Sequence, residues 1–78
     1  MIGKIVIVRD ANKGESNCHM EQPGIVTFRW SESYGVQYCN VKVFPDCNPP
    51  YDMTSVNIYG TKEDALVSGT PDYCGWLA

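Results

Sequence analysis

The sequence has no concentration of basic residues. Six lysines and arginines stand against nine aspartates and glutamates, a net charge of −3. Binding to nucleic acid or to an anionic membrane surface depends on lysine and arginine, so this balance argues against both partners. No apolar run approaches the roughly 20 residues that span a bilayer. The run at residues 1–9 is also too short for a signal peptide. If the protein is secreted, we therefore expect the signal to have been removed and Met1 to be an expression start.

The sequence also lacks the residue groupings that catalysis and metal binding need. A serine or cysteine nucleophile needs a general base that a third group holds in place. His19 is the only histidine, so the sequence offers few residues for that role. The carboxylates fall in apparent turns, and no two form an evident pair for glycoside chemistry. No two cysteines have the short spacing of a metal-binding pair. We expect no enzymatic activity, no cofactor and no metal.

Helical periodicity is nearly absent, and short alternating segments separated by Gly, Pro and Asn take its place. Segment 61–67 begins like a capped helical turn, but the turn residues that follow favour a short strand instead. The predicted strands are Gly3–Arg9, an irregular one near Cys18, Gly24–Trp30, Val36–Phe44, Met53–Tyr59 and Ala65–Ser68, and Tyr73–Leu77 is predicted to be a tail. Six such strands predict a single all-β domain over residues 1–78, a six-stranded antiparallel β-sandwich of two small sheets.

Strand alternation predicts which side chains face the core. Trp30 shares its parity with Val26 and Phe28, so it is the best aromatic candidate for the interior. In the same way Val41, in the strand Val36–Phe44, and Val56 and Ile58, in the strand Met53–Tyr59, are predicted to face inward. Tyr38 and Tyr59 fall on the face opposite to the core residues of their strands. Exposed tyrosines either cover cross-strand neighbours or form a contact surface, and the first role is the commoner.

The strand Gly24–Trp30 has no proline and a polar face, so it can pair with a partner strand if it lies at a sheet edge. Exposure parity makes Arg29, Tyr34 and Lys42 the candidate protein-binding residues. We expect a monomer that binds another protein.

Four cysteines, Cys18, Cys39, Cys47 and Cys74, favour disulfides, because a chain of 78 residues has a marginal core. The run from Cys39 to Cys47 reads as extended and would hold these two cysteines too far apart to bond. Two pairings remain open. One is Cys18–Cys39 with Cys47–Cys74, and the other is Cys18–Cys47 with Cys39–Cys74.

The order of elements resembles the MAX effectors, the small secreted ToxB-like effectors of plant-pathogenic ascomycete fungi. The similarity lies in Cys18 ahead of Pro23-Gly24, in Cys47 at the close of the strand Val36–Phe44, and in the strand that ends at Gly60. Members commonly carry a cysteine at the start of the first strand, and Ile2–Ile5 contains none. If Cys18 takes that role, the resemblance favours Cys18–Cys47 with Cys39–Cys74.

The resemblance implies a secreted, non-enzymatic protein that binds a host plant protein, in some members by strand pairing at an edge, and that plant immune receptors can recognise. One alternative is a tendamistat-like enzyme inhibitor, whose sequential pairing would be Cys18–Cys39 with Cys47–Cys74. Another is a sugar-binding module built on Tyr and Trp.

Overall fold

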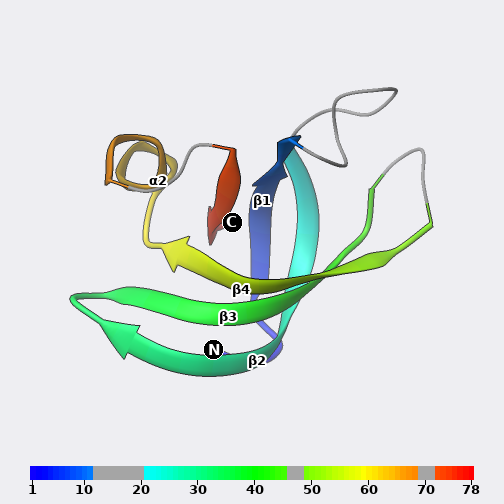
Figure 1. The fold of residues 1–78 in the computed structure, drawn as a ribbon, viewed down its shortest axis with the longest axis horizontal. Helices are drawn as coiled ribbons and strands as arrows, with labels where there is room; N and C mark the ends of the chain where they lie inside the picture. The colour runs from blue at the N-terminus through cyan, green and yellow to red at the C-terminus, as the bar shows by residue number, and fades with distance from the viewer. Residues whose placement is uncertain (12–20, 46–48, 69–71) are drawn as a thin grey trace.

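The computed structural model describes residues 1–11, 21–45, 49–68 and 72–78. The chain is all-β, and the described part forms one sheet with a single short helix (Figure 1). The elements are β1 (Ile5–Asp10), β2 (Glu21–Ser33), β3 (Val36–Val43), β4 (Tyr51–Tyr59), α2 (Lys62–Ser68) and β5 (Tyr73–Leu77). The helix is not long enough to cross a membrane, and the described residues contain no other candidate span.

The sheet closes on itself in the order β1-β2-β3-β4-β5, with β5 beside β1. Neighbouring strands are antiparallel except β4 and β5, which pair in parallel at Ile58 and Tyr59. The predicted sandwich of two sheets is therefore wrong. The segment Tyr73–Leu77, which was expected to be a tail, instead returns along β1 and closes the barrel. The strand expected near Cys18 lies outside the described residues.

The predicted strand Ala65–Ser68 is also wrong, because these residues belong to α2. The hydroxyl of Thr61 accepts a hydrogen bond from the Asp64 backbone N–H at 3.2 Å, and so caps the first turn. A parallel pair such as β4 and β5 needs a crossover connection, and α2 supplies it. The topology thus decides between the helical and extended conformations that this segment could adopt.

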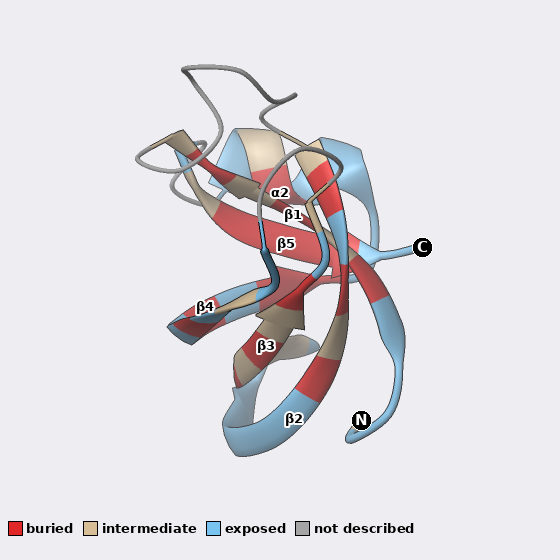
Figure 2. Ribbon diagram, turned by 90° about the vertical axis from the view of Figure 1, so that its right-hand side faces the viewer, coloured by how far each residue is buried: buried red, intermediate tan, exposed pale blue. Residues whose placement is uncertain are grey.

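The interior of the barrel is filled by small branched side chains. Val26, Val41, Val56 and Ile58 are buried there, which confirms their predicted inward orientation. Figure 2 shows the buried positions gathered on the strands that close the barrel, while the distal curve of β2 is exposed. Among the residues that the structure describes, the interior cluster consists of Val6, Val8, Val26, Cys39, Val41, Val43, Met53, Val56 and Ile58.

A second buried cluster lies between α2 and the outside of the barrel wall. It consists of Tyr59, Ala65, Cys74 and Trp76. Tyr59 does lie on the parity opposite to the core, as predicted, but α2 covers that face and buries it. Burial of Tyr59 therefore depends on the helix that the sequence pattern assigned to a strand.

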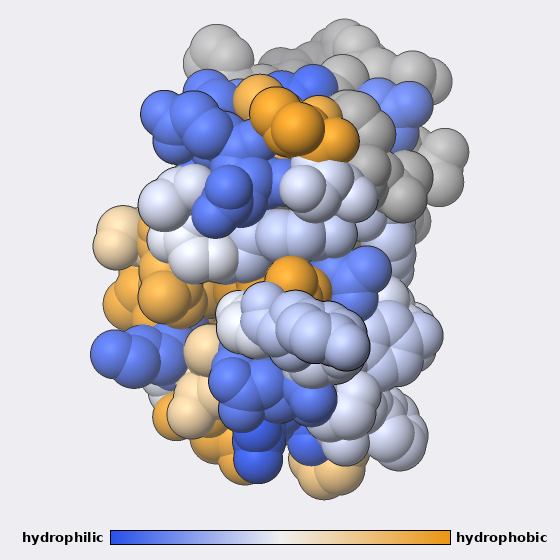
Figure 3. All heavy atoms as spheres, turned by 90° about the vertical axis from the view of Figure 1, so that its left-hand side faces the viewer, coloured by the Kyte–Doolittle hydropathy of each residue, from blue (hydrophilic) through white to orange (hydrophobic). Residues whose placement is uncertain are grey.

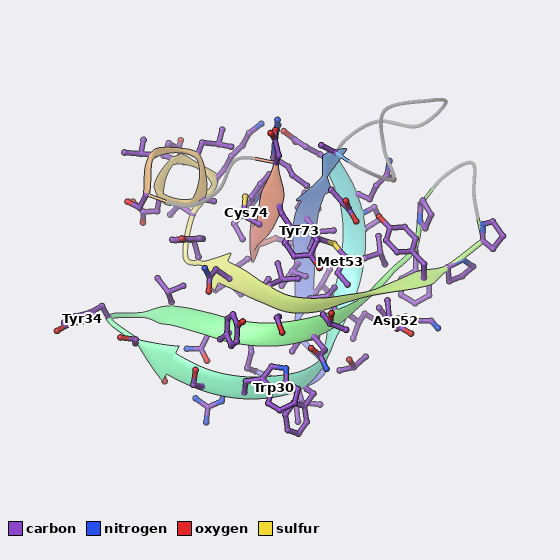
Figure 4. The ribbon with its side chains drawn as sticks, viewed as in Figure 1. Trp30, Tyr34, Asp52, Met53, Tyr73 and Cys74 are labelled. Atoms are coloured by element: carbon purple, nitrogen blue, oxygen red, sulfur yellow. The ribbon has the colours of Figure 1, made fainter. Side chains whose placement is uncertain are left out.

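The structure corrects the predicted Cys39–Cys74 disulfide, because both residues are free and buried. Cys39 belongs to the interior cluster and Cys74 to the cluster under α2, so their side chains occupy opposite faces of the barrel wall. Figure 4 shows Cys74 on the α2 side of β5. Free Cys39 and Cys74 also contradict the sequential pairing expected of a tendamistat-like inhibitor. Cys18 and Cys47 lie outside the described residues, so their predicted bridge stays a prediction.

Candidate protein-binding surface

The hairpin of β2 and β3 extends beyond the closed part of the barrel. Pairing of β2 with β1 reaches Ile25. Two backbone hydrogen bonds continue it by one residue, because the Gly3 N–H donates to the Val26 carbonyl at 2.8 Å and the Val26 N–H donates to the Lys4 carbonyl at 3.0 Å. From Phe28 to Ser33, β2 pairs only with β3 among the described strands. This length of β2 is an open edge, as the lower left of Figure 1 shows.

Two irregularities interrupt β2 where it leaves the barrel. Its register against β3 shifts between Val26 and Phe28, and again between Arg29 and Ser31. Each shift inserts an extra residue into β2, and a β-bulge of this kind re-aims the side chains around it. The prediction that Trp30 lies in the core is wrong for this reason. Trp30 is 57% exposed and Phe28 is 45% exposed.

Three aromatic side chains share the outer face of the hairpin. Phe28 lies directly opposite Asn40, and Tyr38 is two residues from Asn40 on β3, so both share its side of the sheet. The Trp30 indole reaches the same side chain. The rings of Phe28 and Trp30 meet edge to face, with centroids 4.8 Å apart. We call Phe28, Trp30 and Tyr38 the aromatic face.

Asn40 fixes the geometry of this surface. Its Oδ1 atom accepts a hydrogen bond from the Trp30 Nε1–H at 2.9 Å and another from the Ser55 backbone N–H at 3.1 Å. Ser55 has a φ of 59°, and the β3–β4 register shifts beside it. One amide side chain thus connects the exposed indole on β2 to an irregular point of β4. Trp30 is held in position before any partner arrives.

The structure does not bring the three sequence-predicted binding residues together. Tyr34 is fully exposed at the tip of the hairpin, as Figure 4 shows. Lys42 lies on the outer face but forms an ion pair with Asp52 at 3.8 Å. Arg29 lies opposite Cys39, so it belongs to the other face of the hairpin.

On that other face, the Arg29 guanidinium contacts two polar neighbours. It donates to Glu32 at 3.2 Å and to Gln37 at 3.4 Å. These contacts leave Arg29 away from the aromatic face, so the two do not form one site.

Sequence reasoning missed Phe28 and Trp30 as surface residues, and it placed Asn40 on the outer side of its strand without giving it a role. Alternation alone counts every residue of a strand once, so it cannot register a bulge. Asn40 gave one usable signal, because asparagine is disfavoured in the middle of a strand and an occurrence there suggests a special role.

A charged network on another part of the wall has a structural role. Glu21 lies between Arg9, at 3.1 Å, and Lys62, at 3.0 Å, and so connects β1, β2 and α2. The hydrogen bond from Lys62 is the main cause that lowers the pKa of Glu21. Lys62 also lies over the ring of Trp76, 5.7 Å from its centroid. The network therefore fixes α2 against the barrel.

The described residues include no group of three or more His, Cys, Asp or Glu side chains placed to hold a metal ion. Comparison with known proteins gave no match to a family model, to a curated protein or to a solved structure.

Proposed function

We propose that this chain is a secreted effector that acts without catalysis, by binding a host plant protein through the aromatic face of its β2–β3 hairpin. The observation that carries the proposal is the group of exposed rings of Phe28, Trp30 and Tyr38 around Asn40. The resemblance to MAX effectors supplies the host, the secretion and the recognition by plant immune receptors as parts of the same proposal.

Large exposed aromatics that are held rigid are typical of binding hot spots. Trp and Tyr lose little conformational entropy when a partner covers them, and each buries a large area. Trp30 is restrained on both sides, by the ring of Phe28 and by the amide of Asn40. Single exposed apolar residues are common on protein surfaces, but a group of three exposed aromatic side chains is typical of an interaction site.

The open edge of β2 adds a second, shorter means of attachment. The bulges around Thr27 and Trp30 interrupt the regular spacing of backbone donors and acceptors along Phe28–Ser33. Bulges are one of the devices by which edge strands resist pairing. We therefore propose that strand addition is limited to Ser31–Ser33 and that side chains of the aromatic face supply most of the affinity.

The test is affinity capture from plant tissue with three forms of the protein. The wild type is compared with Trp30→Ala and with Val67→Ala, a matched control that removes an exposed apolar side chain from α2 instead. We expect the wild type and the control to enrich the same host protein and Trp30→Ala to lose it. Equal enrichment by Trp30→Ala would contradict the proposal.

A sugar-binding module remains a second candidate, because an exposed indole is also a stacking platform for sugar rings. Trp76 is only 6% exposed and Trp30 is 57% exposed, so changes in tryptophan fluorescence on ligand addition report mainly on Trp30. A saturable change with one member of a glycan panel would support this candidate. Unchanged fluorescence across the panel would exclude sugar stacking on Trp30.

A further inference from the structure

A groove of about 420 Å³ lies where the tip of the β2–β3 hairpin faces α2. Its lining includes Tyr34, Val36 and Tyr59 together with Asp64 and the backbone of Gly35. Figure 1 shows the hairpin tip and the helix on the same side of the molecule, and Figure 3 looks directly onto that side. The volume is within the range of small-ligand sites, about 300–1,000 Å³.

The groove has the chemistry of a receptor for a cation. Among the described residues that line it, Asp64 is the only charged one, and Tyr34 and Tyr59 are the two aromatic ones. A ring face and a carboxylate both attract a cationic side chain, and a planar guanidinium can stack on one while it bonds to the other. The net charge of −3 adds a general attraction for cations.

The stability of the fold does not explain why residue 34 is a tyrosine. With φ values of 52° at Tyr34 and 79° at Gly35, the two central residues of the turn are both in the left-handed region. Such turns favour Asn-Gly, and an aromatic residue at the first position is strained. The side chain is also fully exposed, so it adds nothing to the core. A strained and exposed aromatic residue at the rim of a groove suggests contact with a ligand.

We propose that this groove binds an arginine side chain of the partner protein, with the guanidinium against Asp64 and stacked on Tyr34. The identity of the partner that supplies this arginine rests on the proposed function. Val36 and Tyr38 are alternate residues of β3 and share its outer side, so the groove begins where the aromatic face ends. A partner segment that covers the aromatic face can therefore place an arginine in the groove.

The test uses small peptides and needs no host protein. The ¹⁵N-labelled chain is titrated with acetyl-Gly-Arg-Gly-amide, and its amide shifts are followed by NMR. The control peptide carries citrulline, which has the shape of arginine without its charge. We expect saturable shifts around Gly35, Val36 and Gly60 with the arginine peptide only. Equal shifts with citrulline, or shifts confined to other regions, would overturn the inference.

Two variants test whether Asp64 holds the arginine peptide. Asp64→Asn should weaken the arginine peptide about fivefold, the size expected for one exposed carboxylate–cation pair. Glu63→Gln is the matched control, since Glu63 is the adjacent helix carboxylate and does not line the groove, and it should change little. Unaltered binding in Asp64→Asn would overturn the proposal.

Tyr34→Asn separates binding from folding. Asparagine suits the left-handed turn, so this variant should unfold at a higher temperature than the wild type while it binds the arginine peptide more weakly. Wild-type affinity in Tyr34→Asn would contradict the role given to the ring. Trp30→Ala should bind the peptide normally, so loss of host capture and loss of arginine binding are separate results.

Discussion

The indole N–H of Trp30 donates a 2.9 Å hydrogen bond to Oδ1 of Asn40, an atom that also accepts from the Ser55 backbone N–H. Three strands, β2, β3 and β4, therefore meet at one amide side chain. The arrangement links the exposed indole on β2 to the irregular point of β4 at Ser55. A partner that contacts Trp30 meets a ring whose orientation the sheet has already set.

Asn40→Ala should lower the free energy of unfolding by about 1–2 kcal/mol, because it removes the acceptor shared by Trp30 and Ser55. Gln37→Ala is the control, since Gln37 accepts a single long hydrogen bond from Arg29 in an exposed position. We expect its effect to stay within about 0.5 kcal/mol. Urea unfolding of both variants makes the comparison. Equal decreases in the free energy of unfolding would show that the acceptor shared at Asn40 stabilises the protein no more than an ordinary exposed hydrogen bond.

Gly75→Ala should destabilise the barrel where β5 closes it. A Cβ atom at this position would lie 2.7 Å from Ile58 Cδ1 and 3.0 Å from the backbone oxygen of Ile7. Overpacking of this kind costs about 1–3 kcal/mol. Gly60→Ala is the matched control, because its Cβ would meet nothing within 4 Å. Thermal unfolding of the two variants checks this, and a Gly60→Ala variant as unstable as Gly75→Ala would contradict it.

The thiols of Cys39 and Cys74 should resist modification in the native protein. Both are buried, and burial is the main cause that raises the pKa of each thiol. A thiol-specific reagent should react with both only after unfolding, since the thiolate is the reactive form. A thiol assay with and without denaturant, in the absence of reductant, measures this. Rapid reaction of either thiol in the folded protein would refute the buried placement.

A mass map of a non-reduced digest tests the remaining disulfide. With Cys39 and Cys74 free, only Cys18 and Cys47 are left to pair. The chain following Cys18 is held to the chain preceding Cys47 by a 2.9 Å backbone hydrogen bond from Phe44 to Pro23. We expect a Cys18–Cys47 peptide and no other cystine. A disulfide-linked Cys39–Cys74 peptide would contradict the finding that these two cysteines are free.

Alkaline pH should destabilise the protein through Tyr51. Burial, with the nearby Asp10 carboxylate as a further cause, raises the pKa of Tyr51 from 10.0 to about 12. The folded state then holds the proton more tightly than the unfolded state does. The stabilising contribution is complete below pH 10 and is lost as the pH rises through 12.

The measurement is the free energy of unfolding in urea as a function of pH. Tyr51→Phe removes the titrating phenol, so its stability should fall less steeply than that of the wild type between pH 10 and pH 12. The slopes are compared rather than the absolute values, because the substitution also removes a hydrogen bond to Asp10. Parallel profiles would contradict the assignment to Tyr51.

Alternation in the sequence predicted most of the strands, because a strand with one buried face has a period of two that can be counted. It located Val41, Val56 and Ile58 inside, and the barrel confirms them. It failed for Trp30, because the bulge between Val26 and Phe28 changes the parity of the residues that follow it, and Trp30 itself lies within the second bulge.

The candidate site was less predictable than the fold. Tyr34 was expected at the surface and is fully exposed there, but its place beside Tyr59 and Asp64 depends on how α2 packs. Arg29 and Lys42 were chosen by the same parity argument and lie on opposite faces of the hairpin. Local pattern cannot predict such groupings, because they join segments far apart in the chain.

The sequence by itself determined an all-β chain and the branched residues of its interior, because both follow from local alternation and turn chemistry. Only the tertiary structure decided that the sheet closes into a barrel, since closure depends on the contact between Tyr73–Leu77 and β1. Cys39 and Cys74 lie in different clusters of this barrel, and the parallel pairing of β5 with β4 requires a crossover connection, which residues 62–68 form as a helix. Long-range pairing fixed these features, and no local preference specifies it.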